Sequence, residues 1–445
     1  MRQSDFFVHT FVFVIRQTQY LLFAMTTLLL IVFILGYLTI ALEGVFEFNK
    51  TATALLTGVL CWTVYALFHQ TGVVEQLSHH LASISEILFF LLAAMTVVEL
   101  IDAHGSFDLI TDRITSRNPR VLLWTIALIA FFLSALLDNL TTAIVMVSLL
   151  RKLIQDPHLR KIMAGVVIIA ANAGGAWSPI GDVTTTMLWI GGQITTGNII
   201  RTLFFPSLVS LLVPLLFLSF RQTFKTETVE SVPLLPQINA RARFERNIMF
   251  GLGLGGLLFV PIFKTFTHLP PYMGMLLVLG VIWAVSELIH KHKDDEERKP
   301  FTAAYALSRI DTTSVLFFLG ILLAISCLEA THLLQNLATW LNQTIGNLDV
   351  IVLLIGLASA LIDNVPLVAA TMGMYDLATY PTDHRIWEFL AYCAGTGGSI
   401  LVIGSAAGVA VMGMERLDFG WYLRQISGLA LLGYLAGALV YVLLV

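Results

Sequence analysis

Apolar residues occur in long runs along this chain, and short polar stretches separate the runs. About 20 consecutive apolar residues let an α-helix cross the ~30 Å hydrocarbon core of a bilayer. The pattern predicts twelve apolar segments, at residues 20–42, 51–68, 81–101, 121–154, 162–190, 200–220, 247–266, 272–289, 313–329, 348–380, 386–412 and 421–445. We therefore expect an all-α polytopic membrane protein.

Two of these segments, 121–154 and 348–380, are too long for one span and carry a polar phrase at their centre. The phrases are Ser134-Ala-Leu-Leu-Asp138-Asn139-Leu-Thr-Thr and Ser359-Ala-Leu-Ile-Asp363-Asn364-Val-Pro. Divided into two arms of roughly 16 residues, or about 24 Å at 1.5 Å per residue, each segment falls short of the ~30 Å core. We interpret both as re-entrant hairpins with their tips inside the membrane; two full spans in place of each hairpin remain an alternative.

Landmarks recur in the same order in the two halves of the chain, 221–228 residues apart. The pairs are Trp62 with Trp283, Phe89-Phe90 with Phe317-Phe318, Asp138 with Asp363, and Gly174-Gly175 with Gly397-Gly398. We expect homologous repeats at 20–220 and 247–445, joined by a polar cytoplasmic linker at 221–246 and preceded by an interfacial segment at 1–19. Each repeat has five spans, one of them broken by glycines, and one hairpin. Because five is odd, the second repeat has inverted topology.

Composition and charge support a membrane protein and orient it. The chain is 57% hydrophobic and 12% charged, against about 25% charged residues in soluble domains. One face, formed by residues 43–50, 102–120, 151–161, 221–246, 290–310 and 413–424, collects 20 of the 25 Lys and Arg. The positive-inside rule makes this face cytoplasmic, which puts both termini outside. The charge sorting does not distinguish hairpins from pairs of full spans.

Several other classes of protein find no support in the sequence. Cys61, Cys327 and Cys393 are far apart in apolar segments and fit neither a disulfide framework nor a zinc site. We find no nucleotide-binding fingerprint, metalloprotease helix or nucleophile elbow. We therefore expect no enzyme, no cofactor and no nucleic-acid partner.

The polar phrases and glycine breaks predict two cation sites. An Asp at the centre of a span costs roughly 2.5–3.5 kcal/mol on insertion scales, so it is retained mainly where it lines a cavity or binds a ligand. Na⁺ and other hard cations prefer oxygen ligands, and glycine breaks free backbone carbonyls. The first site would combine Ser134, Asp138, Asn139, Asn172, Gly174 and Gly175. The second would combine Ser359, Asp363, Asn364, Gly398 and Ser399. For any single Asn or Ser, a helix–helix hydrogen bond is an equally good reading.

Asp182 is the asymmetric element of the pattern, because Ser405 takes its place in the second half. Thr184 and Thr185 follow it and add hydroxyl oxygens. A carboxylate in a low-dielectric place holds its proton more tightly, so a proton and a cation can compete for it. Asp182 can also cap the helix that resumes after Gly181, and capping and cation binding are compatible.

Further titratable residues gather near the first three spans: Glu43, Glu86, Glu99, Asp102 and His104. Snorkelling or a salt bridge at the membrane edge is the default interpretation of Glu99, Asp102 and His104. A pH-sensing role for His104 is a weaker alternative.

The motifs resemble the NhaD type of bacterial Na⁺/H⁺ antiporter. The resemblance rests on the first polar phrase, on Asn172-Ala-Gly-Gly-Ala-Trp-Ser-Pro-Ile-Gly-Asp182-Val-Thr-Thr and on Phe90-Leu-Leu-Ala-Ala-Met-Thr-Val-Val-Glu-Leu-Ile-Asp-Ala-His104. It implies the ion transporter superfamily fold, with inverted repeats, two hairpins and a homodimer, in the bacterial inner membrane. In that superfamily the sodium-coupled anion symporters carry Ser-Asn-Thr at each tip. Asp138 and Asp363 stand in the place of that Ser, which implies cation exchange.

These observations lead to one hypothesis and one rival. The hypothesis is exchange of cytoplasmic Na⁺, and also Li⁺, for external H⁺ by alternating access, with Asp138, Asp363 and Asp182 as the carboxylates that bind cation or proton. The rival is a Na⁺-coupled anion symporter or an arsenite-type efflux carrier on the same fold, although three carboxylates would repel a dicarboxylate.

Overall fold

The computed structural model describes residues 3–41, 49–68, 71–111, 114, 116, 118–221, 224 and 239–445. Glu43 and most of the linker 221–246 lie outside these residues. The described chain is helical and divides into two compact units. Unit 1 comprises Met1–Leu88, Thr312–Leu341 and Ala369–Tyr375, and unit 2 comprises Phe89–Asp311, Asn342–Val368 and Asp376–Val445.

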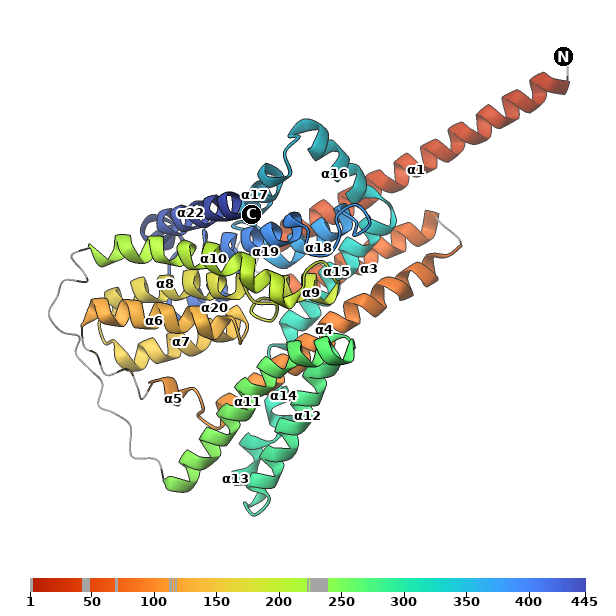
Figure 1. Cartoon of the computed structure of the whole chain (residues 1–445). Helices are drawn as coiled ribbons and strands as arrows, with labels where there is room; N and C mark the ends of the chain where they lie inside the picture. Colours follow the sequence, from red (N-terminus) through yellow and green to blue (C-terminus); the bar gives the residue numbers. More distant parts are fainter. Residues whose placement is uncertain are drawn as a thin grey trace. The chain divides into compact units, whose positions relative to one another are not determined.

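Long apolar helices account for most of the described chain (Figure 1). In chain order the α-helices are α1 (Gln3–Ala41), α3 (Lys50–Phe68), α4 (Val73–Ala103), α5 (Asp108–Thr111), α6 (Pro119–Ser134), α7 (Asn139–Leu153), α8 (Pro157–Ala176), α9 (Val183–Ile190), α10 (Thr196–Ser219), α11 (Ala240–Thr267), α12 (Pro271–His290), α13 (Asp295–Arg298), α14 (Ala303–Arg309), α15 (Thr312–Ala330), α16 (Leu333–Thr344), α17 (Leu348–Ala358), α18 (Asn364–Met374), α19 (Arg385–Gly397), α20 (Ala406–Glu415), α21 (Phe419–Tyr422) and α22 (Gly428–Leu444). The short helices η2 (Lys299–Phe301) and η3 (Leu423–Ser427) complete the described set.

Nine of the described helices are long and apolar enough to cross a membrane, and α16 and α17, bent by 118° at their junction, make a tenth if they count as one span. The protein is therefore an all-helical, polytopic membrane protein, as the apolar pattern predicted. Helix α16 was not among the predicted segments, because its 12 residues mix polar and apolar side chains. Its chain continues through α17, and the two form the bent pair.

The four segments with polar phrases or glycine breaks are each interrupted in the structure. Segments 121–154 and 348–380 become the helix pairs α6–α7 and α17–α18, with turns at Asp138 and Asp363. Segments 162–190 and 386–412 become α8–α9 and α19–α20. The breaks have a local cause, because Asp138, Asp182 and Ser405 each use a side-chain oxygen to cap the first turn of the next helix.

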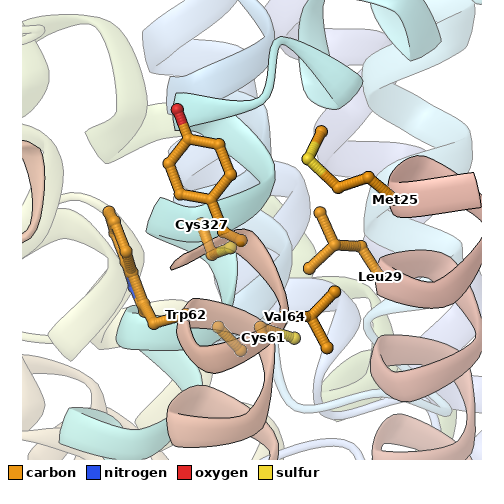
Figure 2. Packing of buried hydrophobic residues seen from close by; sticks show 8 residues of the cluster. Met25, Leu29, Cys61, Trp62, Val64 and Cys327 are labelled. Carbon is orange, nitrogen blue, oxygen red and sulfur yellow. The ribbon is translucent and has the colours of Figure 1, made fainter. Parts of the chain in front are cut away.

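Unit 1 has an apolar core between α1, α3 and α15. Figure 2 shows Met25 and Leu29 of α1 on the side of Cys61 and Val64 of α3, with Cys327 of α15 between them and Trp62 in the same cluster. The Trp62 indole N–H donates to the Leu323 carbonyl at 2.9 Å. Helices α3 and α15 approach closely, since a Cβ on Gly58 would lie 2.5 Å from the Gly320 carbonyl oxygen.

In unit 2, α8 packs against α6, α7, α10 and α19, while α22 runs along α10 (Figure 1). Helix α6 packs on α8, and α17 packs on α19, and each contact is made at a glycine of the second helix. A Cβ on Gly174 would lie 2.1 Å from the Phe131 oxygen, and a Cβ on Gly397 would lie 2.1 Å from the Gly356 oxygen. Gly397 and Gly356 lie 223 and 225 residues after Gly174 and Phe131, so the same helix contact occurs in both halves.

Candidate functional site

The first polar phrase forms the turn between α6 and α7. The half-buried Asp138 carboxylate caps α7 by accepting from the Thr141 N–H at 2.8 Å, and it also accepts from the Thr141 hydroxyl at 2.6 Å. Ser134, at the end of α6, donates to the Ala171 carbonyl at 2.6 Å. The Ser134 hydroxyl therefore links the turn to α8 by a hydrogen bond, and the Asp138 carboxylate caps the N-terminus of α7.

The second polar phrase repeats the serine contact between α17 and α19, but its aspartate bonds a different backbone N–H. Ser359 donates to the Ala394 carbonyl of α19 at 2.8 Å. The Asp363 carboxylate accepts from the Val365 N–H at 3.2 Å. The two aspartates lie in the same local setting, half-buried at a turn between helices.

Asp182 lies at the break between α8 and α9 and is hydrogen-bonded to the turn between α17 and α18. It is buried, with 2% of its surface exposed, and it caps α9 by accepting from the Thr184 N–H at 3.3 Å. Its Oδ2 accepts from the Asn364 side-chain amide at 3.1 Å. Asp138 and Asp363 are both near enough to act on Asp182 electrostatically.

A second chain of hydrogen bonds leads from the polar phrase of the first half to the broken helix of the second half. The Asn139 amide donates to Asn172 Oδ1 at 3.0 Å, and the Asn172 amide donates to the Ser405 hydroxyl at 3.0 Å. Ser405 in turn caps α20 by accepting from the Gly408 N–H at 3.2 Å. The Asn of each polar phrase thus reaches, directly or through Asn172, the capping residue of the other half's broken helix.

The glycines let backbone carbonyls come close to these groups. A Cβ on Gly175 would lie 2.5 Å from the Gly181 oxygen, and a Cβ on Gly398 would lie 2.9 Å from the Gly404 oxygen. Gly395, which corresponds to Asn172, would place a Cβ 3.5 Å from Asp182 Oδ2. In the first half this position carries the Asn172 side chain. In the second half it is Gly395, whose bare backbone faces the Asp182 carboxylate.

The two hydrogen-bond chains include five of the predicted site residues, namely Asn139, Asn172, Asp182, Thr184 and Asn364. Four predicted hydroxyls, those of Ser134, Ser359, Ser399 and Thr185, donate to backbone carbonyls instead. Ser399 donates to the Thr396 carbonyl at 2.6 Å, and Thr185 donates to the Asp182 carbonyl at 2.9 Å. The Thr184 and Thr142 hydroxyl oxygens are buried without a hydrogen-bond partner among the described residues. Thr142 and Ser405 were not among the predicted site residues. Ser405 could have been included, because it occupies the position of Asp182 in the second half.

The network contains many uncharged oxygen atoms, and its three aspartates lack basic partners among the described residues. The described part of the chain has no group of three or more His, Cys, Asp or Glu side chains arranged around one metal ion. None of Asp138, Asp182 and Asp363 forms an ion pair with a described lysine or arginine. Any cation held here would be bound by a few carboxylates together with amide, hydroxyl and carbonyl oxygens.

Comparisons with known proteins identify the family. A family profile described as CitMHS, citrate transporter, matches residues 20–387. The chain is 52% identical over 413 residues to Sodium/proton antiporter 1 of Arabidopsis thaliana, covering 92% of this chain and 71% of that protein. It is 30% identical over 455 residues to the Na⁺/H⁺ antiporter NhaD of Vibrio cholerae, covering 93% and 91%.

A solved structure supports the fold alone. The crystal structure of the Alcanivorax borkumensis YdaH transporter, described as having an unusual topology, matches with a TM-score of 0.52 and 16% identity, over 81% of this chain and 86% of that one. The family matches make the protein a transporter and not an enzyme. The chain belongs to the CitMHS transporter family and, within it, to the NhaD-type sodium/proton antiporters.

Proposed function

We propose that this protein exchanges cytoplasmic Na⁺, and Li⁺ through the same oxygens, for external H⁺. The observation that carries the proposal is the crossed network in which Asn364 bonds Asp182 while Asn139 reaches Ser405 through Asn172. Its relatives are named sodium/proton antiporters. The network supplies a buried carboxylate and neutral oxygens at helix breaks, which is the chemistry of a midplane ion site.

The proposed mechanism is competition for Asp182, with Asp138 and Asp363 as the other two carboxylates. A buried carboxylate without a basic partner is costly when charged, so it takes up either a proton or a cation. Na⁺ would bind the deprotonated site from the cytoplasm together with oxygens such as Asn172 Oδ1. Release outside would leave the carboxylate to be protonated there, and the proton would travel inward on the return step.

We further propose that the two polar turns are tips of re-entrant hairpins. The arms α6 and α7 have 16 and 15 residues, and α17 and α18 have 11 each. At 1.5 Å per residue these arms reach about 24, 22 and 16 Å, less than the ~30 Å hydrocarbon core. The predicted inverted repeats would bring the tips in from opposite faces, with both termini outside. A homodimer in a bacterial inner membrane completes this proposal.

One observation favours a second candidate function. The family profile that matches residues 20–387 is described as a citrate transporter, so a Na⁺-coupled anion symporter is the alternative. A polyanion would need positive charge at its site, and no described lysine or arginine forms an ion pair with the three aspartates. Na⁺-driven uptake of labelled citrate would favour this alternative.

Everted membrane vesicles test the proposal. The vesicles are energised to acidify their interior, and a pH-sensitive dye reports the gradient. We expect added Na⁺ or Li⁺ to dissipate the gradient in vesicles with the wild-type protein but not with Asp182→Asn. A gradient that Na⁺ leaves intact at every pH would refute exchange.

A further inference from the structure

Glu388 is a buried carboxyl group that the network above does not use. It lies in α19, one turn after the helix begins, and 2% of its surface is exposed. The Asn198 amide of α10 donates to its Oε1. Its Oε2 lies 3.2 Å from the Tyr441 hydroxyl of α22, and that hydroxyl also lies 2.9 Å from the Arg385 carbonyl oxygen. Three helices therefore meet at this carboxyl.

The hydrogen bonds around Glu388 suit both of its protonation states. When the carboxylate is charged, the Tyr441 hydroxyl can donate its one hydrogen to Oε2. When the carboxyl is protonated, Oε2–H can donate to the Tyr441 oxygen, whose hydrogen then turns to the Arg385 carbonyl. Asn198 donates to Oε1 in either state. Rotation of one hydroxyl therefore accommodates gain or loss of a proton without leaving a buried polar group unbonded.

The charged neighbours of Glu388 are engaged elsewhere. Asp383 and Arg385 are the charged groups whose fields reach it. Arg385 pairs with Asp349 at 2.9 Å, and the Asp383 carboxylate accepts from the Thr195 N–H at 2.6 Å and hydroxyl at 2.7 Å. Helix α10 contributes the Asn198 amide and α22 contributes the Tyr441 hydroxyl. Glu388 thus has no ion-pair partner among the described residues.

Packing alone does not require a carboxyl at this position. The corresponding residue of the first half, 223 residues earlier, is Gly165 of α8. A Cβ there would lie 2.7 Å from Ile426 Cγ1, so an apolar side chain fills that space. The second half has a buried acid, held by polar groups of α10 and α22, where the first half has an apolar contact.

We propose that Glu388 is a further proton-binding site, distinct from Asp138, Asp182 and Asp363. It lies seven residues before Gly395, or about 10 Å along the helix at 1.5 Å per residue, and Gly395 faces Asp182. On the proposed topology α19 starts at the outer face. Glu388 then lies between that face and Asp182, where it takes up external protons during exchange. This role rests on the proposed function; proton binding itself does not.

Infrared difference spectroscopy of the purified full-length protein tests proton binding directly. A protonated carboxyl gives a C=O stretching band that disappears on deprotonation and shifts in D₂O. We expect the wild-type pH-difference spectrum to contain a component that Glu388→Gln lacks. Glu297→Gln, at an exposed residue of α13, is the matched control and should retain it. A Glu388→Gln spectrum identical to that of the wild type would overturn the proposal.

Tyr441→Phe is the second variant, because it keeps the carboxyl and removes the rotating hydroxyl. The charged form loses its donor, and hydrogen bonds to charged groups are the stronger ones. We therefore expect the band to persist but to disappear at a higher pH than in the wild type. An unchanged titration in Tyr441→Phe would contradict the assigned hydrogen-bond exchange.

Transport measurements separate this inference from the proposed function. In proteoliposomes we expect Glu388→Gln to lower the rate of Na⁺/H⁺ exchange and to flatten the slope of log rate against pH, because one proton-binding group is gone. Gln can still accept from Asn198 and donate to Tyr441, so a purely structural role predicts a wild-type slope and would overturn the transport role. Absence of exchange in the wild type would instead refute the proposed function, and the infrared band would still report whether Glu388 binds a proton.

Discussion

At the scale of single residues, Asp182 combines two roles that a substitution can separate. It caps α9 through the Thr184 N–H and accepts from the Asn364 amide. Asn is as good a helix cap as Asp, while Ala costs about 1 kcal/mol at such a position. Asn carries no charge, however, so it can neither release a proton nor balance a cation.

We therefore predict that Asp182→Asn folds and is inserted like the wild type but does not exchange Na⁺ for H⁺. Asp182→Ala should lose exchange and also unfold at a lower temperature, because the cap is gone. Dye dequenching in vesicles and the melting temperature in detergent measure the two effects. Normal exchange by Asp182→Asn would remove this carboxylate from the mechanism.

His104, which follows the last residue of α4, gives a prediction for pH. Its Nδ1 lies 2.7 Å from the Leu100 carbonyl and so carries the hydrogen, and its Nε2 accepts from His290 Nε2 at 3.0 Å. Burial lowers the pKa of His104 below its ordinary 6.5, an effect that the Leu100 carbonyl partly opposes. The unfolded chain then binds the proton more readily than the folded one, so stability falls as pH drops below about 6.5.

We predict that the melting temperature of the wild type declines between pH 7 and pH 5 and that His104→Gln makes this decline shallower. His292→Gln, at an exposed residue of the loop after α12, is the control and should follow the wild type. Equal slopes for wild type and His104→Gln would show that this histidine does not titrate against folding.

At the scale of helices, two glycine contacts hold the polar turns against the broken helices. Gly174 and Gly397 each face a carbonyl that an added Cβ would approach to 2.1 Å. Real Cβ atoms do not come this near to a backbone oxygen, so the helices would have to separate. Overpacking of this kind typically costs 1–3 kcal/mol.

Gly174→Ala and Gly397→Ala are therefore expected to lower the melting temperature by similar amounts and to reduce exchange. Gly251→Ala in α11 is the matched control, because a Cβ there meets nothing within 4 Å and alanine favours a helix over glycine. Equal melting temperatures for Gly174→Ala and Gly251→Ala would mean that α6 and α8 can separate without cost.

The helices and their breaks were largely predictable from sequence, whereas the partners of the site residues were not. Apolar length locates a span, and Asp138, Asp182 and Ser405 show caps at the breaks. The amphipathic α16 escaped a criterion based on apolar runs. The bond from Asn364 to Asp182 joins residues 182 positions apart, and no spacing rule encodes it. Glu388 was not predicted as a site residue for the same reason, since its partners Asn198 and Tyr441 belong to other helices.

At the scale of the whole molecule, several helix contacts recur in the two halves of the chain, while the polar groups near them differ. Ser134 and Ser359 make equivalent bonds, as do the glycine contacts. At four positions near the network, however, the first half has polar or charged side chains where the second has smaller or apolar ones. These pairs are Thr142 with Leu367, Asn172 with Gly395, Asp182 with Ser405 and Thr184 with Ala407. Two halves with the same helix contacts can thus differ in their polar side chains. At these four positions the larger polar groups belong to the first half.

The predicted inverted repeats also lead to a prediction about orientation. If both polar turns are hairpin tips entering from opposite faces, the two ends of each hairpin lie on one face, and the two hairpins differ in face. We propose single-cysteine variants at exposed hairpin ends, Arg120→Cys and Gln155→Cys for the first and Gln343→Cys and Ala378→Cys for the second. The native Cys61, Cys327 and Cys393 are buried, so they should add little background.

A membrane-impermeant maleimide applied to intact cells should label Gln343→Cys and Ala378→Cys, whereas Arg120→Cys and Gln155→Cys should react only after the cells are opened. The charge distribution decides this direction, because the positive-inside rule places the Arg-rich ends of the first hairpin in the cytoplasm. Labelling of all four variants from one face would rule out inverted repeats. A split within either pair would rule out a hairpin there, because one arm would then cross the membrane completely while the other did not. Each outcome therefore tests whether the turns at Asp138 and Asp363 enter the membrane from opposite faces, as inverted repeats around a shared midplane site predict.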